Sequence, residues 1–156
     1  MRQSRGKVGE ASLVVAQLSD LRTLVELIAQ YYAFDGIRFE GSIVRKAVRA
    51  LLSDPSIGRA WIVRAGEEDI GYCILTFGYD IEFGGPVATL TDLYLGKKYR
   101  RTGLGTRIMQ EIETSCRKMS VRAIELQVER ANSRARRFYL SLGFKSHDRI
   151  PHTKLL

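Results

Sequence analysis

A glycine-rich, basic loop is the part of this sequence whose residue types most directly indicate chemistry. It runs from Lys97 to Thr106, contains the pattern Arg100-x-x-Gly103-x-Gly105, and precedes a helical pattern. Glycines let a ligand approach the backbone closely, and the first amides of a helix lack intrahelical partners. The loop is therefore predicted to bind a phosphate or pyrophosphate. It is neither a Walker loop nor the dinucleotide fingerprint, because the lysine-serine/threonine ending and the third glycine are missing.

The positive charge of the chain is concentrated around this loop. Lysine and arginine number 25 against 17 aspartates and glutamates, a formal charge of +8. Between Lys97 and Arg137 lie 12 basic and 4 acidic residues, so this segment carries the whole excess. Such a concentration indicates an anionic partner. No nucleic-acid-binding signature accompanies the charge, so a small polyphosphate is favoured over nucleic acid.

The elements that must position the loop alternate between strand and helix. Their order, β-α-α-β-β-β-α-β-α-β, predicts an α/β fold: a mixed sheet with helices on both faces, in which the strands before and after the 103–119 helix are parallel. A hairpin turn is expected at 66–69 and a loop at 79–86. Strands are expected at 12–16, 60–65, 70–77, 87–95, 123–128 and within 144–156; helices are expected from Ser19 or Asp20, from Gly41 or Ser42 to before Pro55, at 103–119, and from Asn132 to Gly143.

Two motifs in these elements resemble the GNAT superfamily of N-acetyltransferases. The first is Arg100-x-x-Gly103-x-Gly105 after the strand TLTDLYL. The second lies in ELQVERANSRARRFYLSLGF, which matches the family pattern N-x-x-A-x-x-x-Y-x-x-x-G-F from Asn132 to Phe144. The resemblance covers the second half of the chain closely. It implies one domain over residues 1–156, with 1–10 as a flexible tail, and parallel central strands that splay apart.

The resemblance also implies acetyl-CoA as cosubstrate. The amides from Arg101 to Thr106 would hold its pyrophosphate, and the strand would pair with the pantetheine arm. A cationic side chain among Lys97, Arg101, Arg107 and Arg136 would meet the 3′-phosphate. The residues expected to bind acetyl-CoA are Leu93, Tyr94, Leu95, Arg100, Arg101, Thr102, Gly103, Leu104, Gly105, Thr106, Asn132 and Arg136.

Acetyl transfer to an amine needs a base and an acid. By resemblance, Asp92 is the first candidate for the base that deprotonates the amine, with Glu82 and Asp80 as second choices. Tyr139 matches the family tyrosine that protonates the departing thiolate, and a backbone amide near Leu93 would stabilise the oxyanion.

The acceptor side is expected to come from the first two helices and the loops before the 87–95 strand. These supply Tyr31, Tyr32 and Phe34, then Tyr79 and Glu82. Aromatic faces and carboxylates suit a cation. The expected acceptor is therefore a small cationic amine, such as a polyamine, an aminoglycoside or an amino-acid derivative.

Other readings remain open at this point. The chain could instead be a CoA-binding sensor without turnover, a protein N-acetyltransferase, or a nucleic-acid-binding domain. A homodimer is compatible with the resemblance. The polar N-terminus and the lack of an apolar run of ~18 residues favour a cytoplasmic protein that contacts no membrane. Cys73 and Cys116 are expected in the core, since neither forms a C-x-x-C pair, and no metal site is expected.

Overall fold

The computed structural model describes residues 11–156, so the predicted tail at 1–10 lies outside the described residues. They fall into two compact units, one ending at Leu126 and the other comprising Gln127–Leu156. The first unit holds β1 (Ala11–Val15), η2 (Leu18–Asp20), α1 (Leu21–Asp35), α2 (Gly41–Ser53), β2 (Gly58–Ala65), β3 (Glu68–Asp80), β4 (Gly85–Leu95), η3 (Lys97–Tyr99), α3 (Leu104–Lys118) and β5 (Ala123–Leu126); the second holds α4 (Ser133–Ser141).

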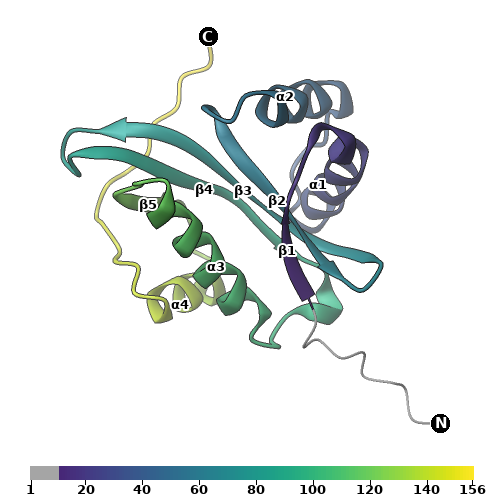
Figure 1. Ribbon diagram of the computed structural model, residues 1–156. Helices are drawn as coiled ribbons and strands as arrows, with labels where there is room; N and C mark the ends of the chain where they lie inside the picture. Colours follow the sequence, from purple (N-terminus) through teal and green to yellow (C-terminus); the bar gives the residue numbers. More distant parts are fainter. Residues whose placement is uncertain (1–10) are drawn as a thin grey trace. The chain divides into compact units, whose positions relative to one another are not determined.

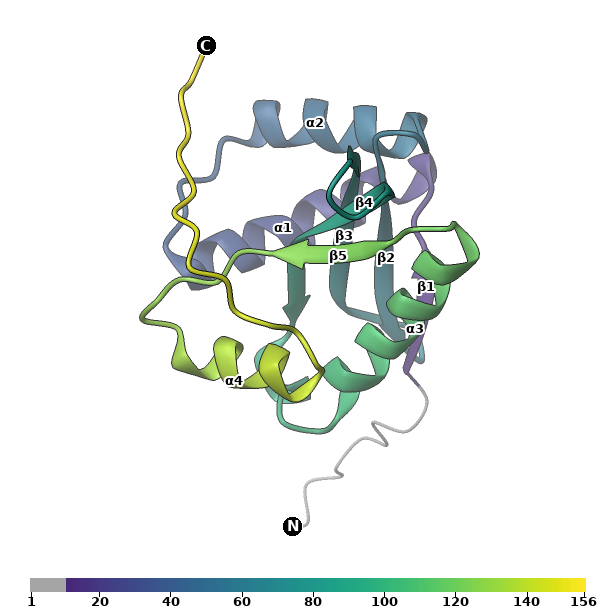
Figure 2. The ribbon, with the colours of Figure 1, turned by 90° about the vertical axis from the view of Figure 1, so that its left-hand side faces the viewer.

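The sheet of the first unit is mixed, as predicted. Its order is β1-β2-β3-β4-β5, with antiparallel neighbours except for the parallel pair β4 and β5. The long connection between β4 and β5 contains α3, which is what parallel neighbours require. Helices α1 and α2 lie on one side of the sheet and α3 lies on the other (Figures 1 and 2).

The core consists of one apolar layer on each face of the sheet. On the α1 face, Leu24 and Ile28 of α1 and Leu51 of α2 pack with Ile62 and Ile74 of the sheet. On the opposite face, α3 buries the stripe that the sequence predicts, Leu104, Ile108, Ile112 and Cys116. The guanidinium of Arg107 in α3 donates a hydrogen bond to the Ala11 carbonyl oxygen of β1, which ties this helix to the sheet.

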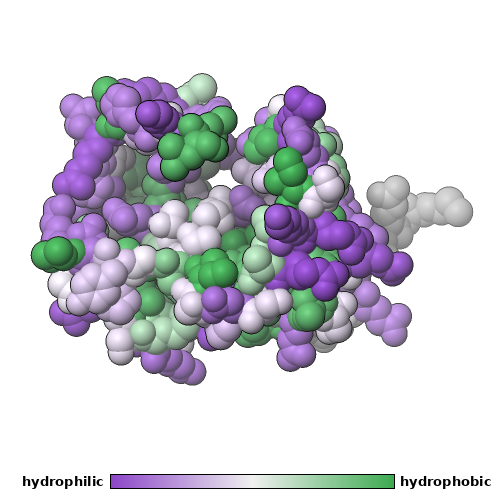
Figure 3. Space-filling model, turned by 90° about the horizontal axis from the view of Figure 1, so that it is seen from above, coloured by the Kyte–Doolittle hydropathy of each residue, from purple (hydrophilic) through white to green (hydrophobic). Residues whose placement is uncertain are grey.

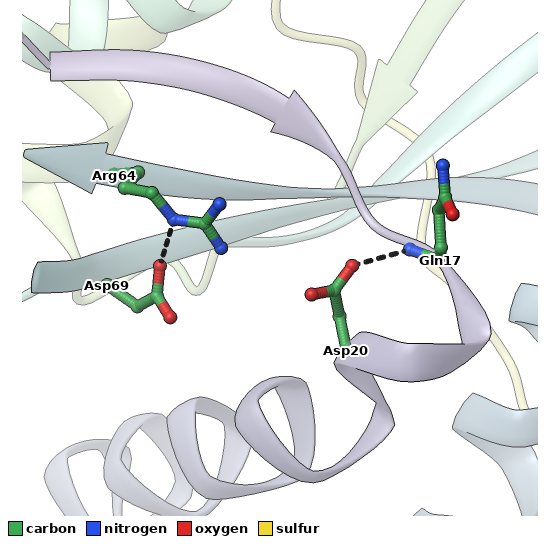
Figure 4. A network of polar contacts seen from close by, with 4 residues as sticks. All are labelled: Gln17, Asp20, Arg64 and Asp69. Atoms are coloured by element: carbon green, nitrogen blue, oxygen red, sulfur yellow. Dashed lines mark hydrogen bonds and ion pairs between the residues drawn. The ribbon is translucent and has the colours of Figure 1, made fainter. Parts of the chain in front are cut away.

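Hydrogen bonds and an ion pair define two chain reversals near the start of α1 (Figure 4). Asp20 stands at the N-cap position of α1 but makes no side-chain bond to that helix. Its carboxylate instead accepts from the Gln17 amide, at 2.8 Å, and closes η2. Arg64 Nε lies 2.7 Å from Asp69 Oδ1 across the β2–β3 hairpin. This pairing draws Glu68 and Asp69 into β3, so the turn is shorter than the predicted 66–69.

The loop expected at 79–86 is shorter than predicted, because its first two and last two residues belong to strands and only 81–84 form the turn. Tyr79 pairs with Pro86 and Asp80 with Gly85, which extends β3 and β4 into a tight hairpin. The Asp80 carboxylate accepts from the Glu82 amide at 2.7 Å. Gly84 adopts a φ of +72°, which favours glycine. The glycines and carboxylates of this segment therefore build a turn.

The C-terminal segment also differs from expectation. No strand or helix forms between Phe144 and Leu156, although one or two strands were expected there. Its apolar residues do not alternate with polar ones, and Pro151 supplies no amide for a strand ladder. Strand β5 is also shorter than predicted, since it ends at Leu126.

No helix within residues 11–156 is long and apolar enough to cross a membrane. Viewed from above, hydrophilic residues dominate the surface, and hydrophobic ones lie among them in small patches (Figure 3).

Candidate active site

The loop between β4 and α3, from Lys97 to Gly103, presents a helix N-terminus without a side-chain cap. We call these residues the phosphate loop. Gly103 stands at the N-cap of α3 with a φ of +82°, and it has no side chain that could cap the first amides of the helix. A Cβ placed on Gly103 would meet no atom within 4 Å. The Thr102 hydroxyl turns away and donates to the Tyr99 carbonyl oxygen at 2.8 Å. The chain thus fits an anionic group here.

The phosphate loop is held at its start by contacts with β3. The Tyr99 hydroxyl donates to Glu68 Oε2 at 2.6 Å, and Lys98 Nζ lies 2.9 Å from Glu68 Oε1. These hydrogen bonds lower the pKa of Glu68, which keeps its carboxylate charged. Arg101, a little further on, has a φ of +62°, which is strained for a residue with a side chain.

Arg100 connects the phosphate loop to β4 and α1. Its Nε donates to the Leu95 carbonyl oxygen at 2.7 Å. Its guanidinium carbon lies 4.1 Å from the ring centre of Phe34 and 5.5 Å from that of Tyr94. The side chain predicted to contact the cofactor therefore braces the loop, and it covers one face of Phe34.

The two parallel strands separate beside this loop. The β4–β5 ladder pairs Val87 with Ala123 and ends where Leu90 pairs with Leu126, whereas β4 continues to Leu95. The Gly96 amide bonds to Ile70 of β3. Along an antiparallel pair, successive residues point their main-chain amides and carbonyls alternately toward and away from the partner strand. The main-chain groups of Leu93 and Leu95 therefore point away from β3, toward the edge of β4 that β5 no longer covers. This is the expected splay, and it suits main-chain pairing with an extended ligand.

A β-bulge at Thr91 determines which face of the sheet carries Asp92. Ile74 pairs with Asp92 but Leu75 pairs with Leu90, so Thr91 is an extra residue in β4. Its hydroxyl donates to the Ile74 carbonyl oxygen at 3.2 Å. Without this extra residue, the alternation of side chains along β4 would put Asp92 on the α3 face of the sheet, the face that carries Leu90. The bulge turns Asp92 and Tyr94 to the face covered by α1.

Four tyrosines gather on that face: Tyr31 and Tyr32 of α1, Tyr72 of β3 and Tyr94 of β4. We call them the tyrosine cluster. The ring centre of Tyr31 lies 5.9 Å from that of Tyr32, 6.4 Å from that of Tyr72 and 5.8 Å from that of Tyr94. The Tyr72 hydroxyl donates to Asp92 Oδ2 at 3.2 Å. The cluster therefore surrounds a carboxylate with aromatic rings.

The surroundings of Asp92 change its proton affinity. Burial raises the pKa of Asp92, and the hydrogen bond from Tyr72 partly opposes this rise. Burial, with Asp35 and then Asp92 as further causes, raises the pKa of Tyr31 to about 12. The tyrosine is therefore neutral at physiological pH. A carboxylate whose pKa is raised is a stronger base than an exposed one, which suits proton removal from a substrate.

The structure brings together only some of the residues predicted for the acceptor. Tyr31 and Tyr32 belong to the tyrosine cluster, and Phe34 lies close to it under Arg100. Tyr79 is 74% exposed near the far end of β3, about 23 Å along the strand from Tyr72 at ~3.3 Å per residue. Glu82 lies in the adjoining turn. The last two are not beside Asp92.

The second unit contains the other predicted residues. The Asn132 side-chain oxygen accepts from the Ala135 amide at 3.0 Å and caps α4, as its sequence position predicts. Arg136 lies in the first turns of this helix, and its Nη1 approaches the Arg130 carbonyl oxygen at 3.5 Å. The Tyr139 ring lies 5.1 Å from Phe138 and 5.5 Å from Phe144. Gly143 ends the helical segment with a φ of +89°.

Sequence reasoning missed Tyr72 and the bulge. A signal for the bulge exists, because Leu90 and Leu93 are three residues apart where an uninterrupted strand face repeats every two. Tyr72 carries no such signal. It belongs to an apolar strand run, and only the pairing of Tyr72 with Tyr94 puts it beside Asp92.

The fold and the arrangement of the site are typical of an acyltransferase, and the match to a family model identifies the family. The model of the GNAT family of acetyltransferases matches residues 22–144. The chain therefore belongs to the GNAT family, whose members are acetyl-CoA-dependent N-acetyltransferases. This membership favours an enzyme over the sensor and nucleic-acid-binding alternatives.

Solved structures agree with this fold. An integron cassette protein from the mobile metagenome of Cole Harbour Salt Marsh is 28% identical, with a TM-score of 0.82 over 92% of this chain and 90% of that one. A possible acetyltransferase from Clostridium difficile 630 is 22% identical, with a TM-score of 0.82 over 94% and 97%. An aminoglycoside acetyltransferase from an uncultured soil metagenomic sample is 15% identical, with a TM-score of 0.77 over 94% and 95%. No curated protein matches the chain.

Proposed function

We propose that this enzyme acetylates the primary amine of a small cationic molecule, with Asp92 as the base. The observation that carries the proposal is the position of Asp92, which the Thr91 bulge turns into the tyrosine cluster beside the open edge of β4. An acceptor amine beside Asp92 would thus lie next to the strand proposed to hold the acetyl donor.

The need for a base follows from the acceptor. An alkylamine with a pKa of about 10.4 is almost entirely protonated at pH 7, and removing the proton costs roughly 4.6 kcal/mol. The Asp92 carboxylate takes this proton directly or through a water molecule, which leaves the nitrogen lone pair free to attack. The raised pKa of Asp92 brings its basicity closer to that of the amine.

Acetyl-CoA supplies the acetyl group as a thioester when it is bound. The amides from Arg101 to Thr106 bind its pyrophosphate, because the start of α3 carries no side-chain cap. The main chain of Leu93 to Leu95 would pair with the pantetheine arm, and the Leu93 amide would be the donor for the thioester oxygen. In the second unit, the family pattern makes Tyr139 the residue that would protonate the thiolate, and Asn132 and Arg136 the residues that would bind acetyl-CoA.

The class of acceptor is inferred from the aromatic and acidic groups around Asp92. Tyr31, Tyr32 and Phe34 present rings along α1, and Asp35 follows them with a carboxylate that accepts from the Tyr31 hydroxyl at 3.4 Å. Rings and carboxylates attract ammonium groups. A polyamine, an aminoglycoside or an amino-acid derivative has the required charge.

Acetyl transfer to a panel of amines tests the proposal. The panel contains diamines, polyamines, aminoglycosides, amino-acid amides, a neutral hydroxylamine and peptides with a free N-terminus or a lysine, and the release of free CoA thiol is measured. We expect cationic small amines to have the highest kcat/KM. Preference for the neutral acceptor or for the peptides would refute the class of acceptor.

The role of Asp92 is tested with the best acceptor of that panel. We expect Asp92→Asn to lower kcat/KM by 10²- to 10⁴-fold, in the range usual for a lost general base. Glu67→Gln, in the exposed β2–β3 turn, removes a carboxylate elsewhere and serves as the control. An Asp92→Asn enzyme within threefold of the wild type would show that Asp92 is not the base.

A further inference from the structure

Tyr72 is a buried, titratable residue that the proposed reaction does not yet use. It lies in the middle of β3, is 0% exposed and ranks first by volume among the fully buried side chains of the described residues. Its ring centre is 6.0 Å from that of Tyr94 and 6.4 Å from that of Tyr31. The aromatic contacts on both sides fix the plane of the ring and hence the direction of its hydroxyl.

That hydroxyl is aimed at the carboxylate of Asp92. It donates to Oδ2 at 3.2 Å, and no other hydrogen bond to this carboxylate occurs within residues 11–156. The Tyr72 hydroxyl is buried and the Asp92 carboxylate is partly buried, and this bond gives each of them a partner. It occupies one oxygen of Asp92 and leaves Oδ1 available.

The groups that face Asp92 leave Tyr72 as the side chain that stabilises its charge. From α1 the neighbours are Tyr31 and Tyr32, with the carboxylate of Asp35 beyond Tyr31. From β3 the neighbour on this face is Tyr72, because the side chain of Cys73 points to the α3 face. The guanidinium of Arg100 on this face lies against Tyr94 and Phe34 and bonds to the Leu95 carbonyl oxygen.

We propose that Tyr72 is a positioning residue for acetyl transfer: its hydroxyl holds Asp92 Oδ2 so that Oδ1 accepts the proton of the acceptor amine. The N–H bond of the ammonium breaks as the Oδ1–H bond forms, and Tyr72 keeps its own proton throughout. Burial raises the pKa of Tyr72 far above its ordinary value, which keeps it a donor at every pH of interest. The inference rests on the proposed role of Asp92.

The pH dependence of Tyr72→Phe tests this role. The variant keeps the ring and its packing but removes the donor, so the pKa of Asp92 rises and less of the carboxylate is ionised at acid pH. We expect the acid limb of kcat/KM to move to higher pH. At pH 6 the variant should lose about tenfold in kcat/KM, whereas at pH 9 it should lose less than about threefold.

Tyr79→Phe is the matched control, because it removes a tyrosine hydroxyl from the same strand at a position that is 74% exposed and distant from Asp92. Its acid limb should coincide with that of the wild type. Thermal unfolding of all three proteins shows whether each variant is folded. An NMR titration of the Asp92 carboxyl carbon, in wild type and Tyr72→Phe without substrates, measures the same change independently of activity.

An unchanged acid limb and an unchanged Asp92 titration in Tyr72→Phe would overturn the inference, whatever the loss of rate. If Asp92→Asn abolishes activity while Tyr72→Phe shows no shift, the positioning role alone is wrong. If Asp92→Asn retains activity, the proposed base is wrong and the role of Tyr72 is rejected with it.

Discussion

At the scale of single residues, the site depends on one inserted threonine and one partly buried carboxylate. Thr91 turns Asp92 to the α1 face, where rings replace the water that would stabilise its charge. Ionised carboxylates are costly to bury, so proteins place them where function needs them. The hydrogen bond from Tyr72 offsets part of the free-energy cost of moving this charge away from water.

Asp92→Asn should therefore stabilise the folded protein at neutral and alkaline pH. The pKa of Asp92 is higher in the folded than in the unfolded state. The protonated carboxyl therefore makes its full contribution to folding stability below the unfolded pKa of about 3.9. This contribution is lost as the pH rises through the folded pKa. The gain in Tm of Asp92→Asn over wild type should be near zero at pH 4 and grow toward pH 8. Thermal unfolding followed by circular dichroism measures it.

Asp54→Asn serves as a control for which the expected change in stability has the opposite sign. Hydrogen bonds from Ser56 lower the pKa of Asp54, so this carboxylate stabilises the fold above its unfolded pKa and loses that effect as pH falls. Its amide variant should be less stable than wild type at pH 8. A lower Tm for Asp92→Asn at pH 8 would mean that ionised Asp92 stabilises the fold.

At the scale of elements, the end of β4 and the start of α3 lie at the two ends of one short loop. Glu68 of β3 fixes the loop through Lys98 and Tyr99, and Arg100 ties it to Leu95. The N-cap residue of α3 is Gly103, which has no side chain to offer the first amides of the helix. A helix start of this kind can bind an anion through its amides.

Gly103→Ala should weaken acetyl-CoA binding several-fold as well as destabilise the fold. An alanine at a φ of +82° costs about 1 kcal/mol even though its Cβ meets no atom within 4 Å. Relief of that strain turns the first amides of α3 away from their present direction. Calorimetric titration with acetyl-CoA and urea unfolding measure the two effects.

Gly66→Ala separates the effect of backbone strain on stability from the effect of the substitution on acetyl-CoA binding. Gly66 has a φ of +61° and equally open surroundings, but it lies in the β2–β3 turn. Its alanine variant should lose similar stability and bind acetyl-CoA like the wild type. Equal loss of affinity in both variants would exclude a specific role for Gly103.

Prediction from the sequence succeeded where local rules determine structure. The phosphate loop follows from its glycines, and α4 follows from Asn132 and Gly143, whose capping and left-handed conformations the structure confirms. Prediction failed where pairing between strands determines the local structure. Tyr79 and Pro86 have turn-like neighbours, yet their cross-strand partners hold them in strands. Tyr72 could not be found because its nearness to Asp92 depends on a bulge in a different strand.

At the scale of the whole molecule, charge and family membership point to the same ligand. The chain carries a formal charge of +8, and its excess lies in the segment that begins at the phosphate loop. Acetyl-CoA is a polyanion, and the GNAT family uses it. Attraction between such partners increases association and weakens as salt screens the charges.

Saturating acetyl-CoA should raise the Tm of the full chain by about 5 to 10 °C. A ligand at about 100 times its Kd adds roughly 2.7 kcal/mol, and each kcal/mol moves the Tm of a domain of this size by about 2 to 4 °C. The shift should shrink at high salt, and pantetheine, which lacks the phosphates, should give almost none. Differential scanning fluorimetry measures it, and an equal shift with pantetheine would argue against the phosphate loop as the main anchor.

Strand β3 supports both halves of the chemistry. At its first residue Glu68 fastens the phosphate loop, and four residues later Tyr72 meets Asp92. The proposed anchor of the acetyl donor and the contact to the proposed base are therefore four residues apart on one strand. On the proposed function, substitutions on α1 would change the surroundings of the acceptor while both of these β3 contacts stay in place.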